Sequence, residues 1–207
     1  MFLKYIYPAL SCICAGLFFN QAEAVSESPS YYYFAYGSNM SSSWMRHRME
    51  EGPKKMQEKG LWEGPLGLDK IVPIGRGVLY GYQRTFSKIN SPSETEGYAT
   101  ISPAANAQVE GVIYKLNDQH LKVLDFYEGV NTGQYYRTII KVKNSKGIIL
   151  DAFVYIAEPG KVDLNRRPSK KYLQLLLEGA EEFQLSPETI RKLKEWRPED
   201  FTNPLDK

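Results

Sequence analysis

Two short segments combine residue types that could do chemistry. The first is Tyr36-Gly37-Ser38-Asn39, which directly follows a strand-like aromatic run at residues 31–35. A glycine lets the backbone bend close to a ligand, and successive N–H groups in such a turn can bind an anion. The tetrapeptide is therefore either a cradle for substrate oxygens or an ordinary strand-to-loop turn, which the local sequence alone favours.

The second segment places Glu128 among apolar and aromatic residues, in Leu124-Asp125-Phe126-Tyr127-Glu128-Gly129-Val130. A carboxyl group in such surroundings suits general acid–base catalysis, because it can accept a proton and return it. The alternative is a surface glutamate before a glycine turn, and the local sequence by itself favours that alternative.

Other kinds of site are not expected. The only histidines are His47 and His120, and neither has an acid, a serine or the other histidine at a recognised spacing for a catalytic triad or a metal site. Both cysteines, Cys12 and Cys14, lie in a segment that we expect to be removed. No P-loop or dinucleotide-type glycine loop is present. The sequence therefore predicts chemistry by carboxylate, hydroxyl and backbone groups, without a metal or a cofactor.

Residues 1–24 have the features of a secretory signal peptide. Lys4 precedes an apolar run at residues 5–19, and Ala22-Glu23-Ala24 supplies the small residues of a cleavage site. The run is short for the roughly twenty apolar residues that span a bilayer. We expect cleavage after Ala24, export to the periplasm or the medium, and no stable membrane association afterwards. An uncleaved membrane anchor or a lipidated Cys12 are the alternatives.

The remaining chain suits a single domain at residues 31–207, preceded by a Ser/Glu/Pro-rich tether at residues 25–30. A formal net charge of +2 with 24% charged residues indicates neither nucleic acid nor an acidic membrane surface as a partner. One local cluster, Arg166-Arg167 with Lys170-Lys171, is either a solvated helix entrance or an electrostatic guide for an anionic small molecule.

Strand-like runs dominate the first two thirds of the domain. They lie at residues 31–35, 75–86, 97–102 and 109–115, and the runs 134–143 and 148–156 form a hairpin around the turn Asn144-Ser145-Lys146-Gly147.

Helical signals come mostly later. Four helices are expected. The first runs from about Ser41 to Met49 and is followed by a loop from Gly52 to Asp69, and the second is short, capped by Asn117 and ends before Glu128. The third has an apolar stripe at Leu173, Leu176, Leu177 and Ala180, and the fourth runs from Ser186-Pro187 to about Trp196. This order predicts an α+β domain and not a doubly wound sheet.

Several blocks, in the same order, resemble the γ-glutamyl cyclotransferase family and its AIG2-like relatives. The shared order matters most, because a lone Tyr-Gly-Ser-Asn is common. The blocks are Phe34-Ala35-Tyr36-Gly37-Ser38-Asn39, Gly97-Tyr98-Ala99-Thr100-Ile101, Gly111-Val112-Ile113-Tyr114, Leu124-Asp125-x-x-Glu128-Gly129-Val130 with Tyr135, Pro168-Ser169-x-x-Tyr172, Gly179-Ala180 and Arg197-Pro198-x-Asp200-Phe201-Thr202.

The resemblance implies a small mixed β-barrel flanked by helices, with the loop and Glu128 facing each other across one cavity. It also implies a cofactor-free reaction, in which the α-amine of a γ-glutamyl group attacks its own γ-carbonyl and releases 5-oxoproline and an amine or amino acid. Glu128 is the implied general base and acid. The implied substrate-binding residues are Tyr36, Gly37, Ser38, Asn39, Tyr135 and Tyr172.

The sequence leaves the identity of the small γ-glutamyl substrate open. The leaving group could be an amino acid, the ε-amine of lysine, the Cys-Gly part of glutathione, or a larger acyl carrier or peptide. Any of Arg76, Arg84 and Arg137 could meet a substrate carboxylate. A non-catalytic, secreted binding protein is the rival interpretation, since fold does not fix function.

Overall fold

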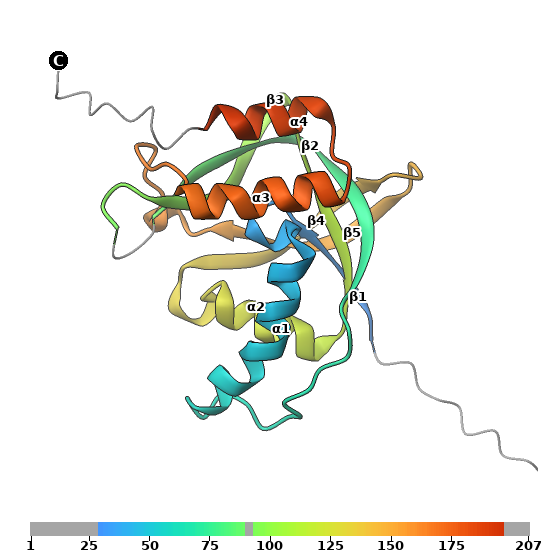
Figure 1. Cartoon of the computed structure of the whole chain (residues 1–207), viewed down its shortest axis with the longest axis vertical. Helices are drawn as coiled ribbons and strands as arrows, with labels where there is room; N and C mark the ends of the chain where they lie inside the picture. The colour runs from blue at the N-terminus through green and yellow to red at the C-terminus, as the bar shows by residue number, and fades with distance from the viewer. Residues whose placement is uncertain (1–28, 90–92, 197–207) are drawn as a thin grey trace, which may run out of the picture.

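Five strands close into a barrel in the order β1-β3-β2-β4-β5 (Figure 1). In the computed structural model, which describes residues 29–89 and 93–196, only the β1–β5 pairing is parallel. The predicted α+β class and the mixed barrel flanked by helices are confirmed. The strands are β1 (Tyr31–Ala35), β2 (Val72–Ile89), β3 (Gly97–Leu116), β4 (Tyr135–Asn144) and β5 (Ile149–Ala157).

Three sequence features lie outside the described residues. They are the predicted signal peptide, all but the last two residues of the tether, and the family-like block at residues 197–202. Within the described ranges, no helix combines the length and the apolar character that crossing a membrane requires.

Strand β1 forms the part of the barrel wall that leads into the Tyr-Gly-Ser-Asn loop. Tyr33, Phe34 and Ala35 are buried, and the strand pairs with β3 on one side and β5 on the other. It is therefore held along both edges. The chain leaves it at Tyr36 and turns through a short 3-10 helix, η1 (Ser38–Met40), before the first α-helix.

The two strands predicted at residues 97–102 and 109–115 are one strand, β3, so their separation in the prediction was wrong. Its middle carries small and polar residues that leave the core, and Asn106 has a φ of 62°. The register against β2 jumps there from Tyr80↔Gln108 to Tyr82↔Pro103. The bulge interrupts the apolar pattern without ending the strand.

Helix α1 (Ser42–Gln57) starts where predicted, because the Ser41 side chain accepts a hydrogen bond from the Trp44 backbone N–H. It continues through Gly52 and Pro53, so the loop predicted from Gly52 was wrong as far as Gln57. A Cβ on Gly52 would lie 2.4 Å from Val123 Cγ1 in the next helix. Close packing of the two helices thus outweighs the local helix-breaking tendency of these residues.

Helix α2 (Asp118–Tyr127) ends just before Glu128, as predicted, and Glu128 is its C-cap residue. Its start is a capping box, in which the Asn117 side chain accepts from the His120 N–H and His120 Nδ1 accepts from the Asn117 N–H. The His120 Nε2 atom lies 2.8 Å from the Asp69 carbonyl oxygen. These contacts give His120 a structural role.

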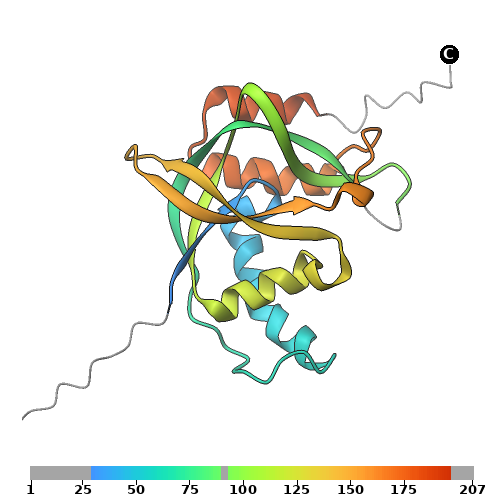
Figure 2. The same ribbon diagram turned by 180° about the vertical axis from the view of Figure 1, so that it is seen from behind.

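The predicted β4–β5 hairpin and the two last helices, α3 (Lys170–Glu182) and α4 (Pro187–Glu195), are also confirmed. Helices α1 and α2 pack together at one end of the barrel, while α3 and α4 cover one side of it (Figure 1). The hairpin crosses the opposite side, as the view from behind shows (Figure 2). Two further 3-10 helices are η2 (Val130–Thr132) and η3 (Pro159–Lys161).

Helix α3 packs directly against the loop that follows β1. A Cβ on Gly179 would lie 2.3 Å from the backbone carbonyl carbon of Met40 and 2.6 Å from the Ser41 backbone nitrogen. Because backbone cannot rotate away as a side chain can, only glycine allows this approach. The position of the loop therefore depends on Gly179.

We expect Gly179→Ala to lower the free energy of unfolding by about 1–3 kcal/mol, because overpacking exceeds the helix propensity that alanine gains. Urea unfolding followed by circular dichroism measures this. Gly160→Ala is the matched control, because nothing lies within 4 Å of its added Cβ, and its change should stay within about 0.5 kcal/mol. Equal stability of the two variants would contradict the packing argument.

Candidate active site

A cavity of about 480 Å³ lies between the loop after β1, the end of α2 and inward-facing barrel residues. Glu128 and the loop line the same cavity, together with the other residues to which the family resemblance assigned catalysis or substrate binding. These residues are Tyr36, Gly37, Ser38, Asn39, Glu128, Tyr135 and Tyr172.

The loop and the carboxylate touch directly. Asn39 Nδ2 donates to Glu128 Oε1 at 3.1 Å and to the Tyr33 hydroxyl oxygen at 2.9 Å. Asn39 is buried, with 3% of its surface exposed. The amide therefore holds Glu128 at a fixed place on the cavity wall, opposite the barrel.

Arg48, which the sequence did not single out, is the second partner of Glu128. Its NH1 atom lies 2.7 Å from Glu128 Oε1, and both side chains are 15% exposed. The guanidinium also lies over the rings of Tyr127, at 4.9 Å, and Trp44, at 5.7 Å. The ion pair between Arg48 and Glu128 is therefore largely shielded from solvent.

Four residues that line the cavity also carry polar side-chain atoms that are buried and have no hydrogen-bond partner within the described part of the chain. Buried polar groups are nearly always paired in native proteins, so the hydrogen bonding of this part of the wall is incomplete. The atoms are Asn39 Oδ1, Trp44 Nε1, Arg48 Nε and the Tyr127 hydroxyl oxygen.

Three tyrosines of the cavity are fixed by backbone groups. The hydroxyl of Tyr36 donates to the Tyr155 carbonyl, and that of Tyr135 donates to the Ala99 carbonyl at 2.9 Å. The Tyr172 hydroxyl oxygen accepts from the Ala99 N–H at 3.1 Å, which leaves its own proton for another acceptor. The aromatic wall of the pocket is thus fixed by backbone groups, and the Tyr172 hydroxyl proton is available to a ligand.

Burial raises the pKa of Tyr36, Tyr135 and Tyr172 above the ordinary value of a phenol. For Tyr172, backbone hydrogen bonds from Ala99 and Ser38 act in the opposite direction and are weaker than burial. All three hydroxyls therefore remain protonated at neutral pH and act as neutral hydrogen-bonding groups.

Position 37 has no room for a side chain, so it requires glycine. A Cβ at this position would lie 2.8 Å from the Tyr172 hydroxyl oxygen and 3.3 Å from Ala99 Cβ. The missing side chain lets the loop backbone reach the cavity wall beside Tyr172. The sequence analysis linked this glycine to a close approach of the backbone to a ligand, whereas the neighbours that require glycine here are Tyr172 and Ala99.

The three arginines considered as carboxylate binders do not line the cavity. Arg76 pairs with the buried Glu110, and Arg84 donates to the backbone carbonyl of the same residue. Arg137 pairs with Asp125 at 2.6 Å. The cations that do line it are Arg48 and Lys88, and a sequence signal for them is limited to Arg48, four residues after Trp44 on one helix face.

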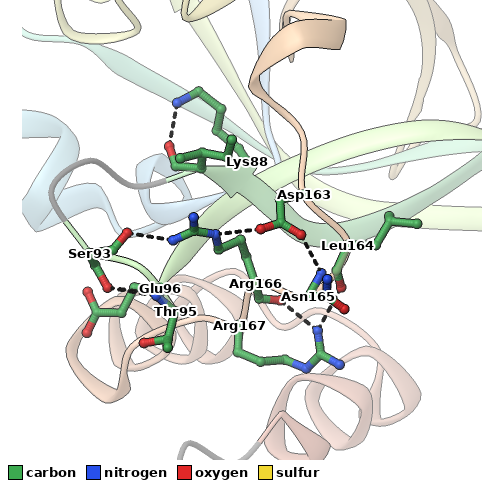
Figure 3. A network of polar contacts seen from close by, with 10 residues as sticks. Lys88, Ser93, Thr95, Glu96, Asp163, Leu164, Asn165, Arg166 and Arg167 are labelled. Atoms are coloured by element: carbon green, nitrogen blue, oxygen red, sulfur yellow. Dashed lines mark hydrogen bonds and ion pairs between the residues drawn. The ribbon is translucent and has the colours of Figure 1, made fainter.

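The two arginines of the basic cluster lie before α3 and hold loops together, whereas Lys170 and Lys171 are exposed in the first turn of that helix. Arg166 Nε donates to Asp163 Oδ2 at 2.9 Å, and its NH1 donates to the Ser93 carbonyl at 2.5 Å (Figure 3). Arg167 NH1 donates to the carbonyls of Leu164 and Arg166. Arg166, with 15% of its side chain exposed, is thus neither a solvated helix entrance nor a free electrostatic guide.

We expect a double-mutant cycle between Arg48→Met and Glu128→Gln to give a coupling energy of about 1–3 kcal/mol in urea unfolding, because the pair is desolvated. The exposed pair Lys141–Asp151, 2.9 Å apart with side chains 75% and 64% exposed, is the control. Its coupling should not exceed about 1 kcal/mol. A coupling for Arg48–Glu128 no larger than the control would show that the ion pair is not formed in solution.

Comparisons with known proteins agree with this architecture. A model described as the AIG2-like family matches residues 108–193. The human protein named γ-glutamylcyclotransferase is 28% identical over 181 residues, which cover 85% of this chain and 84% of that protein. The mouse protein of the same name is 25% identical over 184 residues, covering 87% and 86%.

A solved structure titled γ-glutamyl cyclotransferase superposes with a TM-score of 0.67 at 26% identity, covering 84% of this chain and 92% of that one. The chain therefore has the fold of γ-glutamyl cyclotransferases, and its sequence similarities support the predicted family.

Proposed function

We propose that this protein is a γ-glutamyl cyclotransferase, with Glu128 as general base and acid. The observation that carries the proposal is the contact between Asn39 and Glu128 at 3.1 Å in the wall of a cavity of about 480 Å³. Relatives at 25–28% identity bear this enzyme's name. The substrate class is a small molecule with a γ-glutamyl group joined to an amine nitrogen.

In the proposed reaction, the α-nitrogen of the glutamyl group bonds to its own γ-carbon and the γ-amide C–N bond breaks. Glu128 takes a proton from the α-ammonium as the nitrogen attacks and gives a proton to the departing nitrogen. General acid–base catalysis of this kind contributes about 10²- to 10⁴-fold. The products are 5-oxoproline and a free amine or amino acid.

Positioning supplies much of the proposed rate. Nucleophile and electrophile belong to one molecule, and well-oriented intramolecular reactions reach effective molarities of about 10⁵–10⁸ M. The Gly37 N–H group and the spare proton of the Tyr172 hydroxyl are the donors we assign to glutamyl oxygens. The two side-chain N–H groups of Asn39 bind Tyr33 and Glu128, and the Ser38 backbone bonds to Tyr172, so these two residues position the binding groups. The rings of Tyr36 and Tyr135 pack against the glutamyl carbons.

Arg48 completes this arrangement in our proposal. The α-carbon of a γ-glutamyl group carries an ammonium and a carboxylate, and Glu128 and Arg48 present opposite charges 2.7 Å apart. Glu128 can take the ammonium while Arg48 takes the adjacent carboxylate, because a guanidinium has five N–H donors and can serve more than one acceptor. The pair thus matches the zwitterionic end of the substrate.

The decisive experiment is incubation of the protein with a panel of γ-glutamyl amino acids, γ-glutamyl amines and glutathione, with detection of 5-oxoproline by mass spectrometry. We expect release from at least one member, and a reduction of kcat by about 10²- to 10⁴-fold in Glu128→Gln. The control is Glu63→Gln, an exposed position outside the cavity. Product from no panel member would favour a binding protein, and full activity of Glu128→Gln would exclude the assigned base.

We also propose that the enzyme acts outside the cytosol, on exported or external γ-glutamyl compounds. The support is the N-terminal sequence, with Lys4, the apolar run at residues 5–19 and Ala22-Glu23-Ala24. We expect the protein isolated from its own cells to begin at Val25 and to occur in the exported fraction. N-terminal sequencing after cell fractionation measures this, and full-length protein confined to the cytosol would refute it.

A further inference from the structure

Lys88 places a buried positive charge in the wall of the cavity. The residue lines the cavity, and only 4% of its surface is exposed. Burial of an ammonium group is costly unless another charge compensates it. The question is therefore which negative charge compensates the ammonium of Lys88.

The protein supplies only neutral partners to this ammonium within the described ranges. Lys88 Nζ donates to the Ile89 carbonyl at 2.7 Å and to Gln134 Oε1 at 3.0 Å, and it lies 5.4 Å from the centre of the Tyr135 ring. No described carboxylate lies within ion-pair distance. Because an ammonium has three donors, one N–H remains for a ligand.

The electrostatics agree with an uncompensated charge. Burial lowers the pKa of Lys88, and the neighbouring charge of Lys161 lowers it further. Glu128 acts in the opposite direction and is the weakest of the three influences. An anion bound at Lys88 would act in the same direction as Glu128 and stabilise the buried ammonium.

Hydrogen bonds to the segment around Asp163 fix the backbone around Lys88. Asp163 N–H donates to the Ser87 carbonyl at 2.8 Å, and Lys88 pairs with Val162 in an isolated antiparallel bridge. Figure 3 shows the Lys88 side chain at the end of β2, pointing away from the network of Asp163, Arg166 and Ser93. The network fixes the strand end, and the ammonium is directed to the other side of it.

We propose that Lys88 binds a carboxylate on the leaving part of the substrate and so selects γ-glutamyl amino acids and peptides over γ-glutamyl amines. This inference rests on the proposed function. A γ-glutamyl amino acid carries two carboxylates, and the cavity wall carries two cations. Arg48, paired with Glu128, is placed for the carboxylate beside the reacting amine, whereas Lys88 is held by Gln134 and Tyr135 and is free for the second one.

The test uses two compounds that differ by one carboxylate, γ-glutamylalanine and γ-glutamylethylamide. The ratio of their kcat/KM values is measured for the wild type, for Lys88→Met and for Lys161→Met, which removes a nearby charge outside the cavity. We expect Lys88→Met to reduce the preference for γ-glutamylalanine by about 10- to 100-fold, the range of a charged hydrogen bond. Lys161→Met should keep the wild-type ratio.

An equal loss on both compounds in Lys88→Met would overturn the proposal, because Lys88 would then hold a group common to both or support the fold. Lys88→Gln, which keeps a hydrogen-bond donor without the charge, replaces Lys88→Met if thermal unfolding shows that the methionine variant does not fold. The same ratio is expected to fall in this second variant, and an unchanged ratio overturns the assignment.

Calorimetric binding of the same two compounds separates this proposal from the proposed function. Absence of 5-oxoproline from both compounds with the wild type would argue against turnover of this class. The assignment of Lys88 would then stand if γ-glutamylalanine binds more tightly than γ-glutamylethylamide and Lys88→Met abolishes that difference. It falls if the difference persists in Lys88→Met or if the wild type shows none.

Discussion

The hydrogen bond between Asn39 and Glu128 joins the two halves of the candidate site across 89 positions of sequence. Its formation requires that β1 lie between β3 and β5, so that the chain leaving Ala35 enters the cavity. It also requires that α2 end at Tyr127, which puts Glu128 at the cavity wall. The 3.1 Å contact between Asn39 and Glu128 thus depends both on the closure of the barrel and on the position where α2 ends.

The polar wall of the cavity has a cost in stability. Each buried polar atom without a partner typically costs about 1–3 kcal/mol, and Asn39, Trp44, Arg48 and Tyr127 each contribute one. The hydrophobic core around the barrel offsets these losses, because burial of its apolar side chains stabilises the fold.

The two cations of the cavity are held in different ways. Arg48 is compensated by Glu128 and packed against aromatic rings, so its position is fixed before a ligand arrives. Lys88 is held by neutral oxygens, and no described carboxylate forms an ion pair with it. A substrate with one carboxylate and a substrate with two would therefore interact differently with the field of the same pocket.

Much of the secondary structure followed from the sequence, because its signals are local. The capping residues Ser41, Asn117 and Ser186 start helices as expected, and the β4–β5 hairpin turns at the expected residues. The errors have distant causes. Gly52 stays helical because Val123 packs on it, and β3 continues past its polar middle because β2 pairs with both of its halves.

In the candidate site, too, some features followed from the sequence and others only from the tertiary structure. The order of its sequence blocks pointed to Tyr36–Asn39 and Glu128, and to a cavity between them, through resemblance to one family. Only the tertiary structure selected Arg48 and Lys88 and excluded Arg76, Arg84 and Arg137 from the cavity. The physical reason is that a charge acts according to its burial and its partners, and residues far apart in the chain determine both.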